Sequence, residues 1–372
     1  RNSASHTVKT AIKRPISRLR KMRSARLGAA ISSSRETLPS PLVSIATSAF
    51  WKFLGLLLYS VLFAYVAPWQ LPADEWYTWM IAFLGVDFLF YWSHRVSHRV
   101  RLVWATHQAH HSSEYFNFAT ALRQKWNISA ALVMWLPLPL LGVPPALVFA
   151  AYSLNLVYQF WIHTERIGKL WAPVEFVLNT PSHHRVHHGM NDEYVDKNFG
   201  GTFVFWDRLF GTFQVEKDDV PVRFGTKDNL RSLNVIKANN LPFIKLFRKV
   251  KHTIPSPSYS INNWFIAAGG ILLFTLLLNY ILQENTWPVA IKGQLFAIVF
   301  LGTIGNGGLS EGRTWGLVLW SLLFVVVSPL FLYMNQFTDP KLILPIGLLS
   351  VHAVGTLVAT RRQSAIRNLK TN

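Results

Sequence analysis

The sequence predicts an all-α integral membrane protein whose transmembrane helices carry a histidine-rich helical domain at one membrane face. Hydrophobic residues make up 51% of the chain and charged residues only 15%, whereas soluble domains have about 25% charged residues. Long apolar segments recur along the sequence. Eight of the 13 histidines fall into three tight clusters beside these segments.

A transmembrane helix needs about 20 mainly apolar residues. By this measure we expect spans at 41–67 and 75–92. The prolines in the apolar stretch 128–161 favour a hairpin that enters the membrane and returns. Four more spans are expected near residues 264–282, 287–304, 315–333 and 342–359. Tryptophans near the span ends are typical of the membrane–water interface.

The chain is expected to divide into a basic N-terminal tail, 1–41, a membrane-embedded domain with all three histidine clusters, 42–262, and a C-terminal block of transmembrane helices with a basic tail, 263–372. Of the 37 Lys and Arg residues, 33 fall in segments that this arrangement puts on one side. The positive-inside rule makes that side cytoplasmic, in a bacterial inner membrane or the endoplasmic reticulum. Both termini and the clusters are therefore expected to be cytoplasmic.

The net charge of +19 does not indicate a nucleic-acid partner, because the basic residues flank apolar spans and form no nucleic-acid-binding module. Anionic lipid headgroups are the expected partner of these segments. The first 35 residues contain no acid, as expected for a basic tail lying on lipid or for an organelle transit segment; Pro15 interrupts any long amphipathic helix and so favours the tail.

The histidine spacing predicts a metal centre. The clusters are His94 and His98, then His107, His110 and His111, then His184, His187 and His188. Residues three or four apart lie on one side of an α-helix, so their imidazoles can point at a common centre. Burying so many partly basic groups is costly unless they share protons or metals. We therefore expect two ions with four or five imidazoles each.

Other histidines have weaker signals. His163 follows the expected hairpin at the same membrane face and is expected to be a ninth ligand. For His183 both interpretations stay open, because adjacent helical residues point about 100° apart and His184 is its neighbour. His252 and His352 are expected to be structural.

The ligand chemistry favours redox reactions with oxygen. The chain has no cysteine, no acid lies within a cluster, and the HExxH motif of zinc hydrolases is absent. Imidazole suits iron, zinc and copper alike. Nearby polar groups are expected to orient the rings: Glu114, Asn117, Asn179 and Asp196. Aromatic side chains are expected to line a route for a lipid: Trp92, Trp104, Phe116 and Phe118.

Four stretches carry a family resemblance: HRVSH, WATHQAHHSSEYFNFATALRQ, FWIHTERIG and NTPSHHRVHHGMNDEYVDKNFGGTFVFWDRLFGTF. Together, over residues 80–215, they resemble the fatty acid hydroxylase and sterol desaturase superfamily. Within it, HTERIG and NTPSHHRVHHG are most similar to the alkylglycerol monooxygenase branch and its bacterial relatives. The resemblance implies a membrane-bound di-iron oxygenase whose eight clustered histidines hold the metals.

The resemblance also implies dioxygen as co-substrate, a membrane lipid as substrate, and an electron donor, either tetrahydrobiopterin or a separate redox protein. We therefore expect a lipid monooxygenase with two Fe ions, at a site that Zn can also fill, and most specifically cleavage of the ether bond of alkylglycerols. A sterol desaturase or methyl oxidase, or a fatty acyl hydroxylase, is the alternative. Outside enzymes, a metal transporter or a non-catalytic lipid-binding protein remains; a transporter would place histidines in mid-span.

Overall fold

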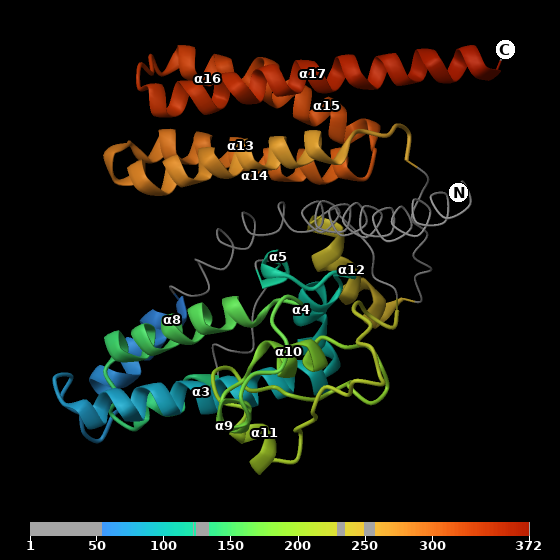
Figure 1. The fold of residues 1–372 in the computed structure, drawn as a ribbon. Helices are drawn as coiled ribbons and strands as arrows, with labels where there is room; N and C mark the ends of the chain where they lie inside the picture. The colour runs from blue at the N-terminus through green and yellow to red at the C-terminus, as the bar shows by residue number, and fades with distance from the viewer. Residues whose placement is uncertain (1–53, 122, 124–133, 229–234, 249–256, 372) are drawn as a thin grey trace, which may run out of the picture.

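The computed structural model describes residues 54–371, except 122, 124–133, 229–234 and 249–256 (Figure 1). In that part every regular element is a helix, and β structure is limited to two isolated bridges. The predicted all-α fold is therefore confirmed. The expected N-terminal tail, the start of the span 41–67, and His252 lie outside the described residues.

The lower part of the molecule in Figure 1 carries the histidine clusters. Its long helix α3, Trp76–Arg99, packs against α4, Arg101–His111, and against α8, Pro145–Ile162, while α12, Val235–Phe247, covers α4. Only Val100, in an extended conformation, separates α3 from α4. The first two histidine clusters therefore lie on two successive helices that pack together.

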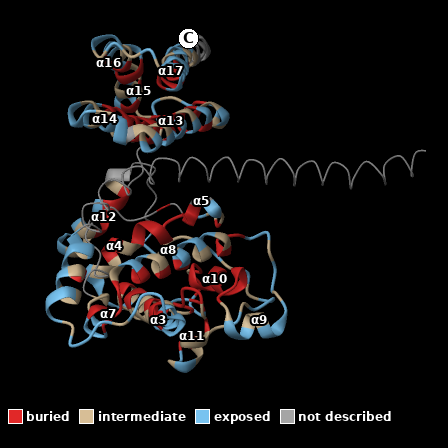
Figure 2. Ribbon diagram, turned by 90° about the vertical axis from the view of Figure 1, so that its left-hand side faces the viewer, coloured by how far each residue is buried: buried red, intermediate tan, exposed pale blue. Residues whose placement is uncertain are grey.

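Shorter helices complete this part of the fold. They are α5, Phe118–Ala121; α7, Pro137–Leu140; α9, Ala172–Val177; α10, Pro181–His187; and α11, Phe205–Leu209. Figure 2 shows buried residues concentrated where α4, α8 and α10 meet. The third histidine cluster thus lies in the interior of the domain, next to the first two.

The membrane hairpin turns at Gly142. This residue has φ +76°, and a Cβ atom there would lie 2.5 Å from the carbonyl oxygen of Trp69, so only glycine fits. The chain then enters α8 through Pro144 and Pro145, with proline at the first helical position where no amide hydrogen is needed. The turn and the helix after it lie where the hairpin is expected, and its return to the same membrane face stays a prediction. The other limb falls mainly outside the described residues.

The C-terminal block contains four membrane-length segments at the predicted positions. They are α13, Asn263–Gln283; α14, Val289–Ser310; α15, Thr314–Leu322, which continues through the π-helical η2, Leu323–Val327, into α16, Ser328–Met334; and α17, Pro340–Thr371. A short 3-10 turn, η1, Glu284–Thr286, follows α13. An apolar core around Leu276, Leu295 and Trp320 joins them. Residues 258–261 pack on this block as well, because Ser258 N–H donates to the Gly312 carbonyl at 2.9 Å.

His352 lies inside the C-terminal block and is structural, as expected. Its Nε2 hydrogen-bonds the Phe265 carbonyl at 2.8 Å, and its Nδ1 accepts from Trp320 Nε1 at 3.2 Å. Both ring nitrogens are thereby satisfied within the bundle.

Five helices in the described part are long and apolar enough to cross a membrane: α8, α13, α14, the α15–α16 segment and the first 22 residues of α17. The helix Leu54–Tyr65 is apolar but shorter. The chain is therefore an integral membrane protein. In Figure 1 the turn after α13 lies at the left end of the C-terminal block, and the C-terminus lies at its right end. Helices α4 and α12 of the lower part lie toward the same end as the C-terminus. Which face is cytoplasmic stays a prediction.

Candidate metal centre

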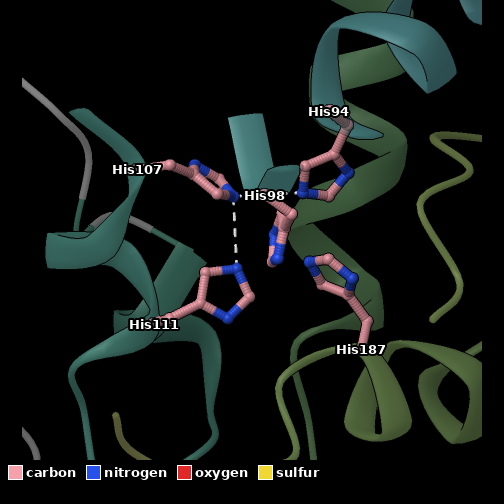
Figure 3. Close-up of side chains that lie close together, drawn as sticks. All are labelled: His94, His98, His107, His111 and His187. Carbon is pink, nitrogen blue, oxygen red and sulfur yellow. Dashed lines mark hydrogen bonds between the residues drawn. The ribbon is translucent and has the colours of Figure 1, made fainter. Parts of the chain in front are cut away.

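The first histidine group joins three helices. His94 and His98 stand one turn apart on α3, His107 and His111 stand one turn apart on α4, and His187 ends α10. One nitrogen from each of these five rings lies within 4.8 Å of the others (Figure 3). His107 Nε2 lies 3.1 Å from the Nε2 atoms of both His94 and His111.

The second group contains His110, His163, His184 and His188, all four buried and again within 4.8 Å of one another. His163 directly follows the last residue of α8, and its Nε2 lies 2.9 Å from Nε2 of His184. The structure therefore brings together all eight clustered histidines and His163. That these nine residues bind metal remains a prediction from their geometry.

Backbone carbonyls fix the orientation of several rings. The Nδ1 atoms donate to carbonyl oxygens: His94 to Phe199 at 2.9 Å, His187 to Lys197 at 2.9 Å, His163 to Gln159 at 2.7 Å and His110 to Arg123 at 3.3 Å. A neutral imidazole that donates from Nδ1 keeps a lone pair on Nε2. These rings therefore present Nε2 as an acceptor toward the centre, which is how metal-binding histidines are held.

The arrangement of the ring nitrogens at the centre suits coordination of a metal ion better than hydrogen bonding between the rings. His110 and His163 both donate from Nδ1, so their Nε2 lone pairs face each other across 3.4 Å, an unfavourable contact unless a cation lies between them. Two ligands of a tetrahedral ion with bonds of about 2.0–2.1 Å are separated by about 3.3–3.4 Å. The buried Nε2 atoms of His98, His187 and His188 have no hydrogen-bond partner within the described residues.

Protons are a poor substitute for that cation. Burial lowers the pKa of His163 to about 4. Burial, reinforced by the neighbouring histidines, holds the pKa of His111, His184, His187 and His188 well below the ordinary value. The rings are therefore neutral near pH 7, which is the form that binds a metal.

One segment, residues 196–199, which we term the acceptor loop, orients three of the five histidines in the first group. It supplies the Lys197 and Phe199 carbonyls described above. The carboxylate of Asp196 lies 3.7 Å from Nδ1 of His98 and 3.3 Å from Nε of Arg99. Of the four predicted polar groups, Asp196 is thus the one placed directly against a clustered histidine.

The acceptor loop depends on two left-handed residues, Asp196 with φ 61° and Asn198 with φ 53°. The Asn198 side chain donates to the carbonyls of His183 and Gln214, at 3.1 and 2.7 Å. The Asp207 carboxylate accepts from the Phe199 and Gly200 amides, at 2.7 and 2.8 Å. Asn198 and Asp207 were not predicted from sequence, although asparagine is the residue type that most readily adopts a left-handed conformation after glycine.

Arg185 cross-links the third histidine cluster to the loop that follows His163. Its guanidinium donates twice to Glu216, at 2.9 and 2.6 Å, and to the carbonyls of Thr164 and Ile167, at 3.1 and 2.6 Å. Sequence reasoning missed it as well. An arginine set between the ligand candidates His184 and His187 is the signal that could have identified it.

The remaining predicted polar residues lie farther from the rings. Asn179 donates to the Gly200 carbonyl at 2.6 Å and so supports the segment after the acceptor loop. The Asn117 amide bonds Thr120 Oγ1 at the start of α5, and Glu114 is exposed. His183 stands outside both groups, because its Nε2 pairs with Glu175 at 3.0 Å. For His183 the structure favours a positioning role.

Two of the four predicted aromatic residues lie against the histidine rings, and two lie farther out. The Trp104 ring contacts the rings of His98 and His111, and the Phe116 ring contacts those of His163 and His188. Trp92 packs on Phe210, 5.0 Å between centroids, and the exposed Phe118 stacks on Phe160. Trp104 and Phe116 therefore line the centre, whereas Trp92 and Phe118 pack farther out.

A cavity of about 470 Å³ connects the centre to the surface between α4 and α12. His98, His111, His187 and His188 line its inner end, and Trp104, Gln108 and Lys245 line its walls. Asp228 accepts from Gln108 and Lys245, at 2.7 and 2.9 Å, which closes this wall. Small molecules can therefore reach both histidine groups from this face.

Comparison with known proteins agrees with this geometry. Residues 79–212 match the family model for fatty acid hydroxylase. These residues form a fatty acid hydroxylase domain. It contains all nine histidines of the two groups, the acceptor loop and Arg185. No solved structure matches the chain.

The fatty acid hydroxylase domain has curated relatives. Alkylglycerol monooxygenase of Danio rerio is 46% identical over 189 residues, which cover 48% of this chain and 42% of the relative. The Homo sapiens protein is 45% identical over 185 residues, which cover 50% of this chain and 41% of the relative. Ornithine lipid hydroxylase of Rhizobium tropici is 27% identical over 151 residues, which cover 38% of this chain and 44% of the relative. The matches thus span less than half the length of each relative.

Proposed function

We propose that the chain is a membrane-bound di-iron oxygenase that uses dioxygen to hydroxylate a lipid, and that it attacks the carbon next to the ether oxygen of an alkylglycerol. The observation that supports this best is the pair of histidine groups within a fatty acid hydroxylase domain that is 45–46% identical to alkylglycerol monooxygenases. The proposal of an ether-lipid substrate is based on those relatives, and the proposal of two metal ions is based on the geometry of the histidines.

The five-histidine and four-histidine groups would each hold one ion. Iron bound there would supply the activation of dioxygen and the removal of hydrogen from an unactivated carbon; zinc can fill an imidazole site but has no redox chemistry. The protein's part is to lower the pKa of buried rings such as His111, His184 and His188, to fix the tautomers of four rings through carbonyl acceptors, and to exclude water by burial.

The position of the centre supports a reacting carbon close to the lipid headgroup. His163 directly follows α8, which is one of the membrane-length helices. The second histidine group therefore lies at the edge of the hydrocarbon layer. The glycerol backbone and the first carbons of the chain lie at that level, whereas deeper chain carbons do not. An ether-linked first carbon satisfies this condition, and so do the first carbons of an acyl chain.

The products follow from the chemistry of an ether. One oxygen atom of dioxygen enters the carbon–hydrogen bond beside the ether oxygen, and the other leaves as water with two electrons and two protons from the donor. The resulting hemiacetal collapses to a fatty aldehyde and glycerol or its phospholipid. The electrons would come from tetrahydrobiopterin or a separate redox protein, and the cavity between α4 and α12 gives a small donor an approach apart from the membrane helices.

A fatty acyl hydroxylase or a sterol desaturase is the second candidate, favoured by the weaker match to an ornithine lipid hydroxylase. A metal transporter is disfavoured, because the histidines gather at the ends of α3 and α8 and not in mid-span.

The test uses the full chain in lipid nanodiscs, loaded with ferrous iron and supplied with oxygen and tetrahydrobiopterin. Alkylglycerol is offered in parallel with a sterol and with free and amide-linked fatty acids. For the sterol and the fatty acids a general electron-transfer system replaces the pterin. Aldehyde from the ether lipid, absent in a His111→Ala variant, is the expected result. Turnover of only the sterol or acyl substrates would refute the ether lipid while leaving the oxygenase standing.

A further inference from the structure

Two short helices outside the membrane-length segments expose large apolar side chains. Trp171 directly precedes α9, Phe176 and Val177 lie on it, and Leu209 ends α11; their exposed fractions are 75%, 60%, 40% and 67%. We term these four residues the α9–α11 patch. Such exposure beside a buried polar centre calls for a partner that covers it.

The α9–α11 patch is one unit. Val204 N–H donates to the Val177 carbonyl at 3.0 Å. The Arg208 guanidinium donates to the carbonyls of Phe176 and Glu175, at 3.2 and 3.3 Å, and lies 4.8 Å from the Phe176 ring. Figure 1 shows α9 and α11 next to each other on the side of the domain below α3. The two helices therefore present their apolar residues together.

Hydrogen bonds place this unit at the depth of the last turns of α8. Tyr158 OH donates to the carbonyl of Asn179, two residues after α9 ends, at 2.8 Å. Asn155 Nδ2 donates to Thr202 Oγ1, three residues before α11 begins, at 3.2 Å. Tyr158 and Asn155 precede the end of α8 at Ile162 by four and seven residues. At 1.5 Å per residue these levels lie about 6 and 10 Å inside the end of the helix.

That depth lies inside the membrane. The 18 residues of α8 extend for about 27 Å, and the hydrocarbon layer is about 30 Å thick, so the whole helix fits within it. Amphipathic elements that lie in the membrane interface bury their apolar side chains about 5–10 Å deep, with tryptophan at the headgroup level. The exposed side chains of α9 and α11 stand at the matching level, which is also the level of Val157 on α8, 71% exposed.

We propose that the α9–α11 patch inserts into the membrane leaflet on the histidine side and acts as an interfacial anchor of the catalytic domain. Its occupant is the lipid bilayer. Only Leu178, Asn179 and Thr180 separate α9 from α10, which carries His184 and His187. The anchor therefore holds the third histidine cluster at a fixed height above the hydrocarbon, and that height determines which carbon of a lipid reaches the centre. The anchor itself does not depend on the ether-lipid proposal.

The absence of cysteine from the chain allows a direct test. Single variants Phe176→Cys and Leu209→Cys are labelled with an environment-sensitive fluorophore and reconstituted as the full chain in phosphatidylcholine nanodiscs. Lipids with a spin label near the headgroup or deep in the chain then quench the fluorescence. Val157→Cys on α8 is the lipid-facing control, and Asp192→Cys, whose native side chain is 90% exposed, is the water-facing control.

Both patch positions should be quenched at least several-fold more than position 192, and more strongly by the shallow label than by the deep one. Quenching equal to that at position 192 would overturn the anchor. Protection from labelling that rises with protein concentration in detergent, without lipid quenching, would also overturn it and would indicate a second copy of the chain as the occupant. Unchanged gel-filtration elution of each variant confirms that the label has not unfolded the domain.

Discussion

Replacing Arg185 by glutamine would remove four hydrogen bonds from the centre of the fatty acid hydroxylase domain. The guanidinium is bidentate to Glu216 and also holds two carbonyls of the loop after His163. Only 9% of the Arg185 side chain and 18% of the Glu216 side chain are exposed. Breaking such a buried pair from one side costs about 3–5 kcal/mol, because the other charge stays behind uncompensated. Since both side chains keep some contact with water, we expect about 3 kcal/mol.

The assay is equilibrium unfolding in detergent, with metal analysis of the same samples. Arg185→Gln should also release the metal of the second histidine group while the first group keeps its ion, because the His163 loop loses its support. The double variant Arg185→Gln/Glu216→Gln should lose less stability than the two single variants added together, since the orphaned carboxylate is gone.

The matched control for this variant is Lys169→Gln, which breaks the surface ion pair with Asp218, 2.7 Å long, and should cause no resolvable change. If Arg185→Gln unfolds within about 1 kcal/mol of wild type, the buried cross-link does not act as argued. The same holds if both metals are retained at full occupancy.

Alanine at His107 should remove metal and activity together, whereas His183→Gln should leave the metal content unchanged; a metal-free variant that still turns over substrate would contradict the proposed centre. Chelation should lower the unfolding midpoint of the wild type, because the ions bind only the folded chain, and an unchanged midpoint would argue against them. Asn198→Ala should be about 1 kcal/mol less stable than Asn198→Gly, because only alanine is penalised for a left-handed φ; equal unfolding free energies would contradict this. Reporter tags at both termini and in 217–251 should map to one membrane face and a tag in 70–74 to the other; termini on different faces would refute the topology.

The histidine spacing was enough to predict which residues gather, but not how they divide. Pairs four apart share a helix face, so His107 and His111 enter one group and His184 and His188 enter the other. His110 lies one residue before His111, about 100° around the helix, and therefore points into the other group. Dividing the rings requires the packing of α4 against α3 and α10, which spacing within a single cluster does not contain.

The groups that orient the rings could be predicted less well, because most of them are backbone atoms. Any residue type supplies a carbonyl, so the Lys197 and Phe199 acceptors leave no mark in the sequence. Glu114 was chosen for its nearness along the chain, and yet it lies on the surface. Asp196, more than 90 residues from His98, is brought to it by the acceptor loop. Distance along the chain is thus a poor guide once a loop folds back over the site.

Asp87 is a further residue that the sequence could have identified as important. An acid in the apolar helix α3 is costly unless it is satisfied, and such residues usually mark a functional position. Its carboxylate is buried and accepts from Asn155 at 2.6 Å, from the Thr202 and Phe203 amides at 2.6 and 3.2 Å, and from Trp206 Nε1 at 2.9 Å.

These donors come from α8 and from the chain that leads from the acceptor loop into α11. Asp87 therefore ties α3 and α8 to the chain that follows the acceptor loop, and its carboxylate accepts these four bonds from residues other than histidine. The cost of placing a charge in the helix is offset by four donors whose own positions it fixes. An Asp87→Asn variant would turn one acceptor into a donor that faces one backbone amide and one side-chain N–H group, so we expect it to loosen the acceptor loop before it disturbs the C-terminal block. Hydrogen exchange at Phe199 and Gly200 would show this directly, and unchanged protection there would mean that the loop holds the rings without help from Asp87.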